Sequence, residues 1–301
     1  MLATLHDKPF DDDNWLFEIK FDGYRAIAEV HHKDVKLYSR NGISFAPLYP
    51  HISEALAQMN ITAVLDGEIV VIDKTGRSDF QNLQNYNDDK GLSLVYYVFD
   101  ILRVGAKDVT GLQLAERKLQ LKKIIKKTTG IIRYSDHVVG KGKAFFKEAS
   151  KNHLEGMIAK RSESEYHTGA RSKDWLKVKN VNTDEVVIAG YTAPRGSREH
   201  FGALILATKK KGGWIYAGHT GTGFTQKILK ELSAKLKPLI RKTSPFDEKV
   251  KVNDEVTWVQ PKLVCNIKFT ERTRDGLFRH PVYQGLRIDK KASEADGADR
   301  K

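Results

Sequence analysis

Cysteine is almost absent from this sequence, which has one cysteine, Cys265, among its 301 residues. A single thiol cannot form a disulfide within the chain. In addition, no group of cysteines and histidines in the sequence has the spacing of a zinc site. These absences exclude a disulfide-stabilised scaffold and a zinc-finger protein.

Long apolar runs are also absent. A membrane-spanning helix needs about 18 or more consecutive apolar residues, and no segment of this sequence approaches that length. The first residues also lack a basic stretch followed by an apolar stretch, which is the pattern of a secretory signal. We therefore expect no membrane association and a cytoplasmic location.

Negative charge is scarce compared with positive charge. The 51 lysines and arginines outnumber the 38 aspartates and glutamates, and the formal net charge is +13. Of this excess, +9 lies in residues 184–301. The balance favours a polyanionic partner, and nucleic acid comes first because contacts to phosphates dominate such binding.

The first 183 residues predict a mixture of antiparallel strands and helices. Apolar residues that alternate from Trp15 to Phe21 predict a half-buried strand. Apolar runs predict further strands over residues 26–30, 35–38, 64–72, 94–102, 131–134, 156–160 and 175–179. Helical spacing of apolar residues predicts helices over residues 48–59, 114–127 and 143–152, with the lysines of the second helix on a solvated face. This content indicates an α+β domain.

The pattern changes at about residue 184, where short strands begin. Five are predicted, at residues 186–191, 203–207, 214–219, 256–259 and 264–269, with one amphipathic helix at residues 225–239. This is the content of an OB-type barrel, a common platform for nucleic acids. The last eleven residues have nothing to bury, so we expect a disordered tail. The expected domains are 1–183 and 184–290, followed by the tail 291–301.

A lysine stands at the end of the first long apolar strand, in the segment Glu-Ile-Lys-Phe-Asp-Gly-Tyr-Arg at residues 18–25. An ordinary lysine has a pKa near ~10.4, so its amine becomes a nucleophile at neutral pH only beside positive charge or when desolvated. A lysine nucleophile attacks either a carbonyl carbon or a phosphorus atom. A surface lysine beside a hairpin turn is the alternative interpretation of this segment alone, so the rest of the chain decides.

Five further segments place polar residues at or within the predicted strands. They are residues 39–42 (Ser-Arg-Asn-Gly), 66–68 (Asp-Gly-Glu), 97–100 (Tyr-Val-Phe-Asp), 155–160 (Glu-Gly-Met-Ile-Ala-Lys) and 175–179 (Trp-Leu-Lys-Val-Lys). In the last segment Lys177 and Lys179 are two residues apart, which in a strand points both side chains to the same side of the sheet.

In this order and spacing, the six segments resemble the nucleotidyltransferase superfamily of ATP-dependent DNA ligases, RNA ligases and capping enzymes. The resemblance extends from about residue 2 to residue 290 and is closest to the ligase module of bacterial end-joining DNA ligases. Residues 2–5, 195–196 and 279–287 carry this closer similarity. The resemblance implies an α+β fold, with a nucleotidyltransferase (ATP-grasp-like) catalytic domain followed by an OB-fold β-barrel.

The resemblance further implies an enzyme, an ATP-dependent DNA ligase that serves DNA repair or end joining. Lys20 would attack the α-phosphorus of ATP, expel pyrophosphate and form a lysyl-AMP. The adenylate would pass to the 5′-phosphate of a nick, and the 3′-hydroxyl would displace AMP to seal the strand. Such phosphoryl transfers need cations and positioning more than acid–base groups.

The same resemblance implies roles for individual residues in nucleotide binding. Lys177 and Lys179 would supply charge at the α-phosphate and depress the pKa of Lys20. Phe99 would stack on adenine, and Arg287 would orient the leaving pyrophosphate. The full set of implied ATP-binding residues is Glu18, Ile19, Arg25, Arg40, Glu68, Phe99, Lys177, Lys179 and Arg287.

Metal and DNA contacts are implied as well. Glu155 and Glu68 would bind Mg²⁺, with Mn²⁺ as the alternative, because these ions take hard oxygen ligands. The residues implied in DNA binding are Arg25, Arg40, Arg195 and Arg198, since a guanidinium group binds phosphate in a bidentate manner.

The expected partner is nicked double-stranded DNA, bound by a monomer in the bacterial nucleoid. Only 19 residues precede Lys20, which leaves no space for the helical DNA-binding domain of larger relatives. We therefore also expect weak intrinsic affinity for DNA and help from a Ku-like end-binding protein.

Two alternatives stay open on the sequence. The first is an RNA ligase or a capping-type nucleotidyltransferase that uses GTP. The second is a non-catalytic nucleic-acid-binding protein built on an inactive ligase scaffold. Five residues argue against the second alternative, because an inactive scaffold has no need of all of them. They are Lys20, Glu68, Glu155, Lys177 and Lys179.

Overall fold

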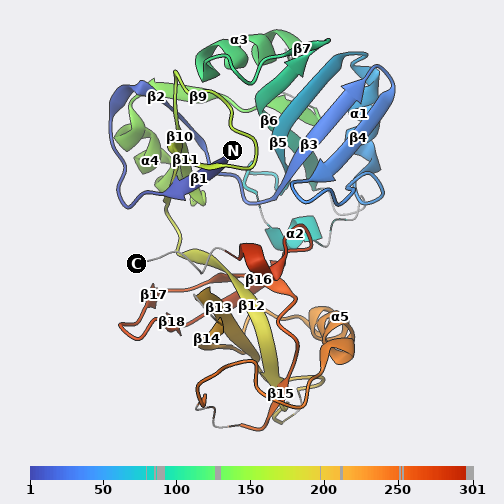
Figure 1. The fold of residues 1–301 in the computed structure, drawn as a ribbon, viewed down its shortest axis with the longest axis vertical. Helices are drawn as coiled ribbons and strands as arrows, with labels where there is room; N and C mark the ends of the chain where they lie inside the picture. The colour runs from blue at the N-terminus through green and yellow to red at the C-terminus, as the bar shows by residue number, and fades with distance from the viewer. Residues whose placement is uncertain are drawn as a thin grey trace. The chain divides into compact units, whose positions relative to one another are not determined.

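The computed structural model describes residues 1–78, 80–84, 86, 92–125, 130–196, 198–210, 213–250, 252 and 254–295. The chain divides into two compact units, Met1–Val181 and Asn182–Lys301. Figure 1 shows that each unit is built on its own β-sheets. None of the helices within the described ranges is both long and apolar enough to cross a membrane.

The N-terminal unit contains two sheets. The first sheet has the strand order β1 (Leu2–Leu5), β11 (Arg171–Lys179), β10 (Gly156–Arg161), β2 (Asp12–Ile19) and β9 (His137–Gly140). The second has the order β4 (Asp34–Ser39), β3 (Tyr24–His31), β5 (Thr62–Ile72), β6 (Ser93–Val104) and β7 (Lys107–Asp108), with β8 (Ile132–Tyr134) beside β6. Only the pairs β1–β11 and β6–β8 are parallel among the described strands. The expected α+β content is therefore confirmed.

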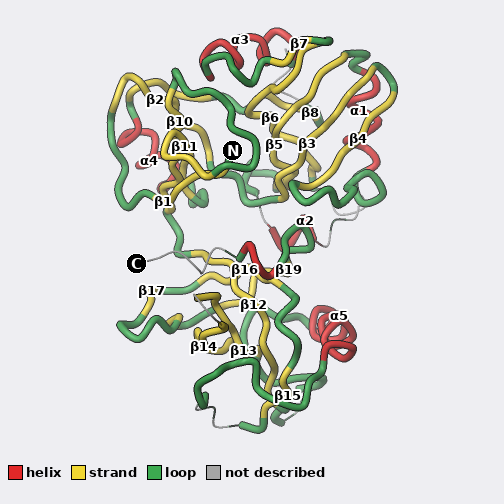
Figure 2. The backbone as a smooth tube through the Cα atoms, in the orientation of Figure 1, coloured by secondary structure: helices red, strands yellow, loops and turns green. Residues whose placement is uncertain are grey.

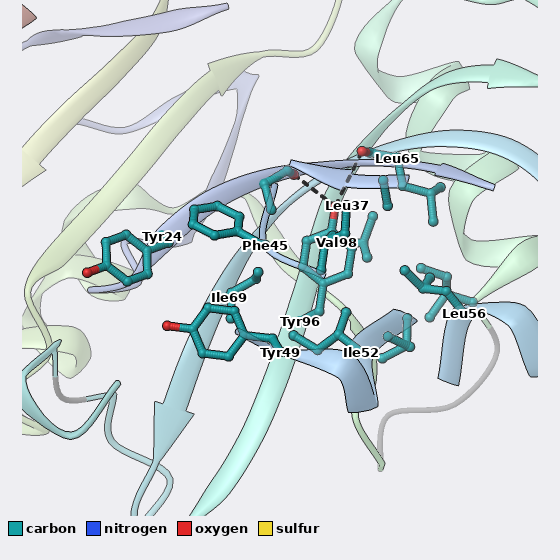
Figure 3. Packing of buried hydrophobic residues seen from close by; sticks show 14 of the residues in the cluster. Tyr24, Leu37, Phe45, Tyr49, Ile52, Leu56, Leu65, Ile69, Tyr96 and Val98 are labelled. Carbon is teal, nitrogen blue, oxygen red and sulfur yellow. Dashed lines mark hydrogen bonds between the residues drawn. The ribbon is translucent and has the colours of Figure 1, made fainter. Parts of the chain in front are cut away.

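The helices of this unit are α1 (Pro50–Gln58), α2 (Phe80–Gln84), α3 (Leu114–Ile124) and α4 (Gly142–Lys151). Ile52 and Leu56 of α1 are four residues apart, so both side chains lie on one face of the helix and pack into the core on the second sheet. Figure 3 shows Tyr96 at the centre of this core. Its hydroxyl donates hydrogen bonds to the carbonyls of Ala26 (2.9 Å) and Leu65 (3.3 Å), so a buried polar group is satisfied.

The first sheet has one apolar face and one polar face. Phe17 and Met157 point to the apolar side, where they pack with the aromatic residues of α4. Successive residues of a strand point to opposite sides, and in the observed register Ile158 pairs with both Glu18 and Lys177. The polar face therefore gathers charged side chains from β2, β10 and β11.

The C-terminal unit is a strongly β-rich domain with one α-helix among its described residues. Figure 2 shows its strands and helix by colour. The main sheet has the order β14 (Gly213–Thr220), β13 (Leu204–Lys210), β12 (Thr183–Thr192), β16 (Val264–Lys268) and β19 (Val282–Leu286), and β15 (Val256–Trp258) also pairs with β12. A hairpin joins β17 (Glu271–Arg272) to β18 (Phe278–Arg279), and the helices are α5 (Gln226–Leu236), η2 (Lys237–Leu239) and η3 (Ala292–Glu294).

Helix α5 covers the core of this unit, as its sequence pattern predicts. Leu229, Leu232 and Leu236 are buried in the core at spacings of three and four residues. The helix begins where the Thr225 hydroxyl accepts a hydrogen bond from the backbone N–H of Ile228 (3.3 Å).

Three expectations from the sequence were wrong. The helix expected over residues 48–59 begins at Pro50, and Leu48 is exposed and precedes it. Lys118 of α3 does not lie on a solvated face, because its side chain is buried and bound to Glu18. Within the expected disordered tail, η3 is ordered and Ala295 is buried against the C-terminal core, so this segment does have something to bury. The remainder of that tail, 296–301, and residues 126–127 of the predicted helix lie outside the described residues.

We expect Leu56→Ala to lower the free energy of unfolding of the N-terminal unit by ~2–5 kcal/mol, which is typical for a cavity-forming change in a core. Leu56 is fully buried, whereas Leu48 is 51% exposed and offers a matched control. Leu48→Ala should change the free energy by less than about 0.5 kcal/mol. Urea denaturation followed by circular dichroism measures both, and equal losses would contradict this packing.

Candidate active site

The N-terminal unit contains a cavity of about 130 Å³ that is lined by strands of both sheets. Its volume is close to that of an engineered cavity of ~150 Å³ that binds one benzene molecule. A single flat ring system therefore fits in it, and the rest of a larger ligand must lie outside. The lining residues are Ala3, Glu18, Ile19, Lys20, Phe21, Arg25, Glu68, Phe99, Ile158, Lys160 and Trp175.

Lys20 and Glu155 meet at the edge of the first sheet. Lys20 directly follows β2, Glu155 directly precedes β10, and the Lys20 Nζ lies 2.5 Å from the Glu155 Oε2. The Lys20 backbone N–H donates to the carbonyl of Gly156 (3.1 Å), so the two chain segments are held together by the backbone. Only glycine suits position 156, because its φ is +152° and an added Cβ would lie 2.1 Å from the Val178 carbonyl oxygen.

The Lys20 amine is held in its charged form. Burial alone would lower the pKa of Lys20, but the Glu155 carboxylate raises it above its ordinary value, with smaller contributions from Asp22 and Glu68. The expectation that Lys177 and Lys179 depress this pKa was wrong. The pKa lies above its ordinary value, because the carboxylates of Glu155, Asp22 and Glu68 together outweigh burial.

The carboxylates beside Lys20 fit a magnesium ion. Glu155 is ion-paired with the Lys20 amine, and Glu68 lines the same cavity as Lys20. Among the described residues, no group of three or more His, Cys, Asp or Glu side chains could hold a metal by itself. Mg²⁺ is usually bound by one or two carboxylates, with waters and substrate phosphates as the other ligands. The donor set of two hard oxygens is of this kind.

Glu18 is the centre of a buried charge network. One carboxylate oxygen accepts a hydrogen bond from the Lys118 Nζ (2.8 Å), and the other accepts one from the Lys160 Nζ (2.9 Å). The Ser135 hydroxyl donates to the second oxygen at 3.3 Å. Burial alone would raise the pKa of Glu18, but the two lysines lower it below its ordinary value. The carboxylate is therefore ionised in the folded protein.

Cations also lie against the aromatic rings of the cavity. The Lys160 Nζ is 4.2 Å from the centroid of the Phe99 ring and 4.3 Å from that of the Trp175 ring. The Arg25 guanidinium carbon is 5.5 Å from the Phe99 centroid. Burial lowers the pKa of Lys160, although Glu18 opposes this shift. The cavity thus combines a ring surface with positive charge, which suits an aromatic ligand that carries anionic groups.

Arg25 is fixed by the second sheet. Its Nε and Nη2 donate to the two Asp66 oxygens at 3.0 Å and 2.6 Å, and its Nη2 also lies 3.2 Å from the Tyr166 hydroxyl. Tyr166 itself donates to Asp66 (2.8 Å). Burial alone would lower the pKa of Arg25, but the Asp66 carboxylate outweighs burial and raises the pKa above its ordinary value. The guanidinium therefore stays charged inside the cavity.

The sequence-predicted site residues other than Glu155 divide into three groups. Those that line the cavity are Glu18, Ile19, Lys20, Arg25, Glu68 and Phe99. Arg40 follows β4, and Lys177 and Lys179 lie on β11, outside the cavity lining. Arg195, Arg198 and Arg287 belong to the C-terminal unit, where Arg195 pairs with Asp254 and the Arg198 Nη1 donates to the Gly221 carbonyl (2.7 Å).

Sequence reasoning missed three residues of this site. Lys118, Lys160 and Trp175 all contribute buried side chains to it or to its charge network. Strand alternation offered a signal for the last two, because Lys160 is two residues from Ile158 and pairs with Trp175 across the strands. For Lys118 there was no signal, since its carboxylate partner Glu18 lies 100 residues away in the sequence.

Two family models match this chain. The ATP dependent DNA ligase domain matches residues 1–179, and the ATP dependent DNA ligase C terminal region matches residues 197–290. The multifunctional non-homologous end joining protein LigD of Pseudomonas aeruginosa is 36% identical over 98% of this chain and 36% of its own length. A LigD of Mycobacterium tuberculosis (strain H37Rv) is 36% identical over 93% of this chain and 37% of its own length.

A solved structure supports the same relationship. Mycobacterial DNA ligase D complexed with ATP and MES aligns with a TM-score of 0.72 at 33% identity, over 98% of this chain and 96% of that one. The chain spans 36–37% of the length of the two curated relatives named above.

Acid should destabilise the N-terminal unit in a way that depends on Glu18. Because the folded pKa of Glu18 is lowered from its ordinary value of 4.5, its stabilising contribution is complete above that value and is lost as the pH falls below it. Glu18→Gln should lower the free energy of unfolding by ~3–5 kcal/mol at pH 7, since two buried lysines lose their counter-charge. As the pH falls, the free energy of unfolding of this variant should decrease less steeply than that of the unchanged protein.

Urea denaturation at pH values from 7 to 3 measures this effect. Glu148→Gln is the matched control, because the Glu148 side chain is 64% exposed on α4, and it should follow the unchanged protein at every pH. If Glu18→Gln had the same pH dependence as the unchanged protein, the assigned role of the Glu18 network would be wrong.

Proposed function

The chain belongs to the ATP-dependent DNA ligases, and on this basis we propose that it seals 5′-phosphate/3′-hydroxyl nicks in DNA through a lysyl-AMP intermediate. The family consists of enzymes, and the expected architecture of a nucleotidyltransferase domain followed by an OB-fold domain is confirmed by the comparisons. The observation that carries the proposal is the position of Lys20, whose amine lies beside Glu155 and lines a ring-sized cavity.

In the proposed first step, the Lys20 nitrogen attacks the α-phosphorus of ATP. A nitrogen–phosphorus bond forms, the bond from the α-phosphorus to the pyrophosphate oxygen breaks, and the attacking amine releases a proton to solvent. The amine must be uncharged to attack, whereas in the free enzyme Glu155 keeps it protonated. When bound, Mg²⁺ on Glu155 and Glu68 would supply positive charge that offsets these carboxylates and the charge of the phosphates.

We assign the cavity to the adenine ring. Phe99 contributes an aromatic ring to the cavity wall, and the cavity has room for about one ring system. Arg25, held by Asp66, and Glu68 face the ribose in this proposal, and Lys177 and Lys179 approach the α-phosphate from β11. Charge that is fixed in place before the reaction stabilises the transition state of phosphoryl transfer most effectively.

DNA completes the proposed reaction. The 5′-phosphate at a nick accepts AMP from Lys20, and the 3′-hydroxyl then attacks that phosphate and releases AMP. Arg25, Arg40, Arg195 and Arg198 are the proposed contacts to DNA, supported by the positive charge of residues 184–301. Two relatives bear names that refer to non-homologous end joining, so a Ku-like end-binding partner is proposed for a monomer that acts in the bacterial nucleoid.

We expect Lys20→Ala to remove adenylation while it leaves the fold intact. Incubation with radiolabelled ATP and magnesium should label the unchanged protein but not the variant, and labelled GTP should label neither. The variant should still seal a nick that already carries AMP on its 5′-phosphate, because that step does not use the amine. Lys173→Ala, an exposed lysine on β11, is the control and should label normally.

Persistent labelling of Lys20→Ala would remove this lysine from the mechanism. Labelling of the unchanged protein with GTP rather than ATP would support a capping-type reaction instead. Sealing of RNA nicks but not DNA nicks would point to an RNA ligase.

A further inference from the structure

The segment that follows β19 is bound to a carboxylate of β12 within the C-terminal unit. The same Glu185 oxygen, Oε1, lies 3.4 Å from the Arg287 Nη1 and forms an ion pair with the Lys290 Nζ. All three side chains are at most 15% exposed, so solvent screens these contacts only in part. One carboxylate oxygen is therefore shared by two cations.

Asp289 holds Arg287 on its other edge. The Arg287 Nε and Nη2 donate to the two Asp289 oxygens at 2.8 Å and 2.7 Å, which is a bidentate pair. The contact of Nη1 with Glu185 is longer than an ordinary hydrogen bond of about 2.7–3.2 Å. Asp289 thus fixes the plane of the Arg287 guanidinium group, and Glu185 contacts the remaining edge of that group at a longer distance.

Two carboxylates, Glu185 and Asp289, and two cations, Arg287 and Lys290, meet in this cluster. A phosphate oxygen can accept from the same two donors as the Glu185 oxygen, because guanidinium and ammonium groups bind carboxylate and phosphate in similar ways. An anionic ligand that binds both cations therefore competes with Glu185.

We propose that Glu185 is a positioning residue that competes with pyrophosphate for Arg287 and Lys290. This inference rests on the proposed function and on the role that the family resemblance implies for Arg287, which is to orient the leaving pyrophosphate. Glu185 holds the two cations in place while no phosphate is present, and it gives them up when pyrophosphate binds. Loss of its charge makes the two cations available at a lower pyrophosphate concentration.

The reverse of the first step measures this competition directly. When pyrophosphate is added to the adenylated enzyme, its oxygen attacks the α-phosphorus, the nitrogen–phosphorus bond breaks, ATP forms, and the Lys20 nitrogen regains a proton from solvent. The pyrophosphate concentration that gives half the maximal rate of AMP loss reports how easily the cations accept it. The full chain is first loaded with labelled ATP and magnesium and then freed of nucleotide.

We expect Glu185→Gln to lower this half-maximal concentration about fivefold, at the lower end of typical coupling between sites. Glu231→Gln is the matched control, because it removes the same charge from the same unit. Glu231 is an exposed residue of α5 that pairs with Lys227. It should leave the half-maximal concentration unchanged. Thermal unfolding of both variants checks that the C-terminal unit is folded.

Three outcomes would overturn the inference. An unchanged half-maximal concentration in Glu185→Gln would mean that Glu185 does not compete, and a raised one would mean that it helps to bind pyrophosphate. An equal decrease in Glu231→Gln would reduce the effect to net charge and would also overturn it. If the unchanged protein formed no lysyl-AMP at all, the proposed function itself would fail, and the two failures are thereby distinguished.

Discussion

The ion pair between Lys20 and Glu155 is the contact on which the rest of the site depends. The Lys20 amine is held 2.5 Å from the Glu155 carboxylate, which keeps it positioned and protonated. The backbone helps to fix this arrangement, because the Lys20 N–H donates to the Gly156 carbonyl at the point where β2 and β10 meet. In the proposed mechanism this contact places the nucleophile, and its activation would require the charges that arrive with the nucleotide.

Buried charge is distributed through the N-terminal unit in a consistent way. The three cations that line the cavity each have a carboxylate partner: Lys20 has Glu155, Lys160 has Glu18, and Arg25 has Asp66. An unpaired buried charge would cost several kcal/mol, so these pairs make it possible to keep positive charge beside apolar rings.

The sequence predicted the parts of this site that depend on local pattern. Alternation in β2 placed Lys20 at the end of an apolar strand, and the lysine pair of β11 follows from a period of two. Contacts between residues far apart in the sequence could not be predicted from local pattern. Lys118 lies on the buried face of α3 with Leu114 and Leu121, and only the folded chain brings it to Glu18. The shift in the pKa of Lys20 was mispredicted for the same reason, since its sign is set by the Glu155 carboxylate 2.5 Å away, which is 135 residues further along the chain.

Peptide mapping by mass spectrometry after incubation with ATP and magnesium tests the central claim most directly. The account predicts one AMP per chain, attached to the peptide that contains Lys20. Lys118 and Lys160 are buried lysines of the same unit and provide internal controls, because their peptides should carry no adduct. Absence of any adduct, or an adduct on one of these other lysines, would contradict the account.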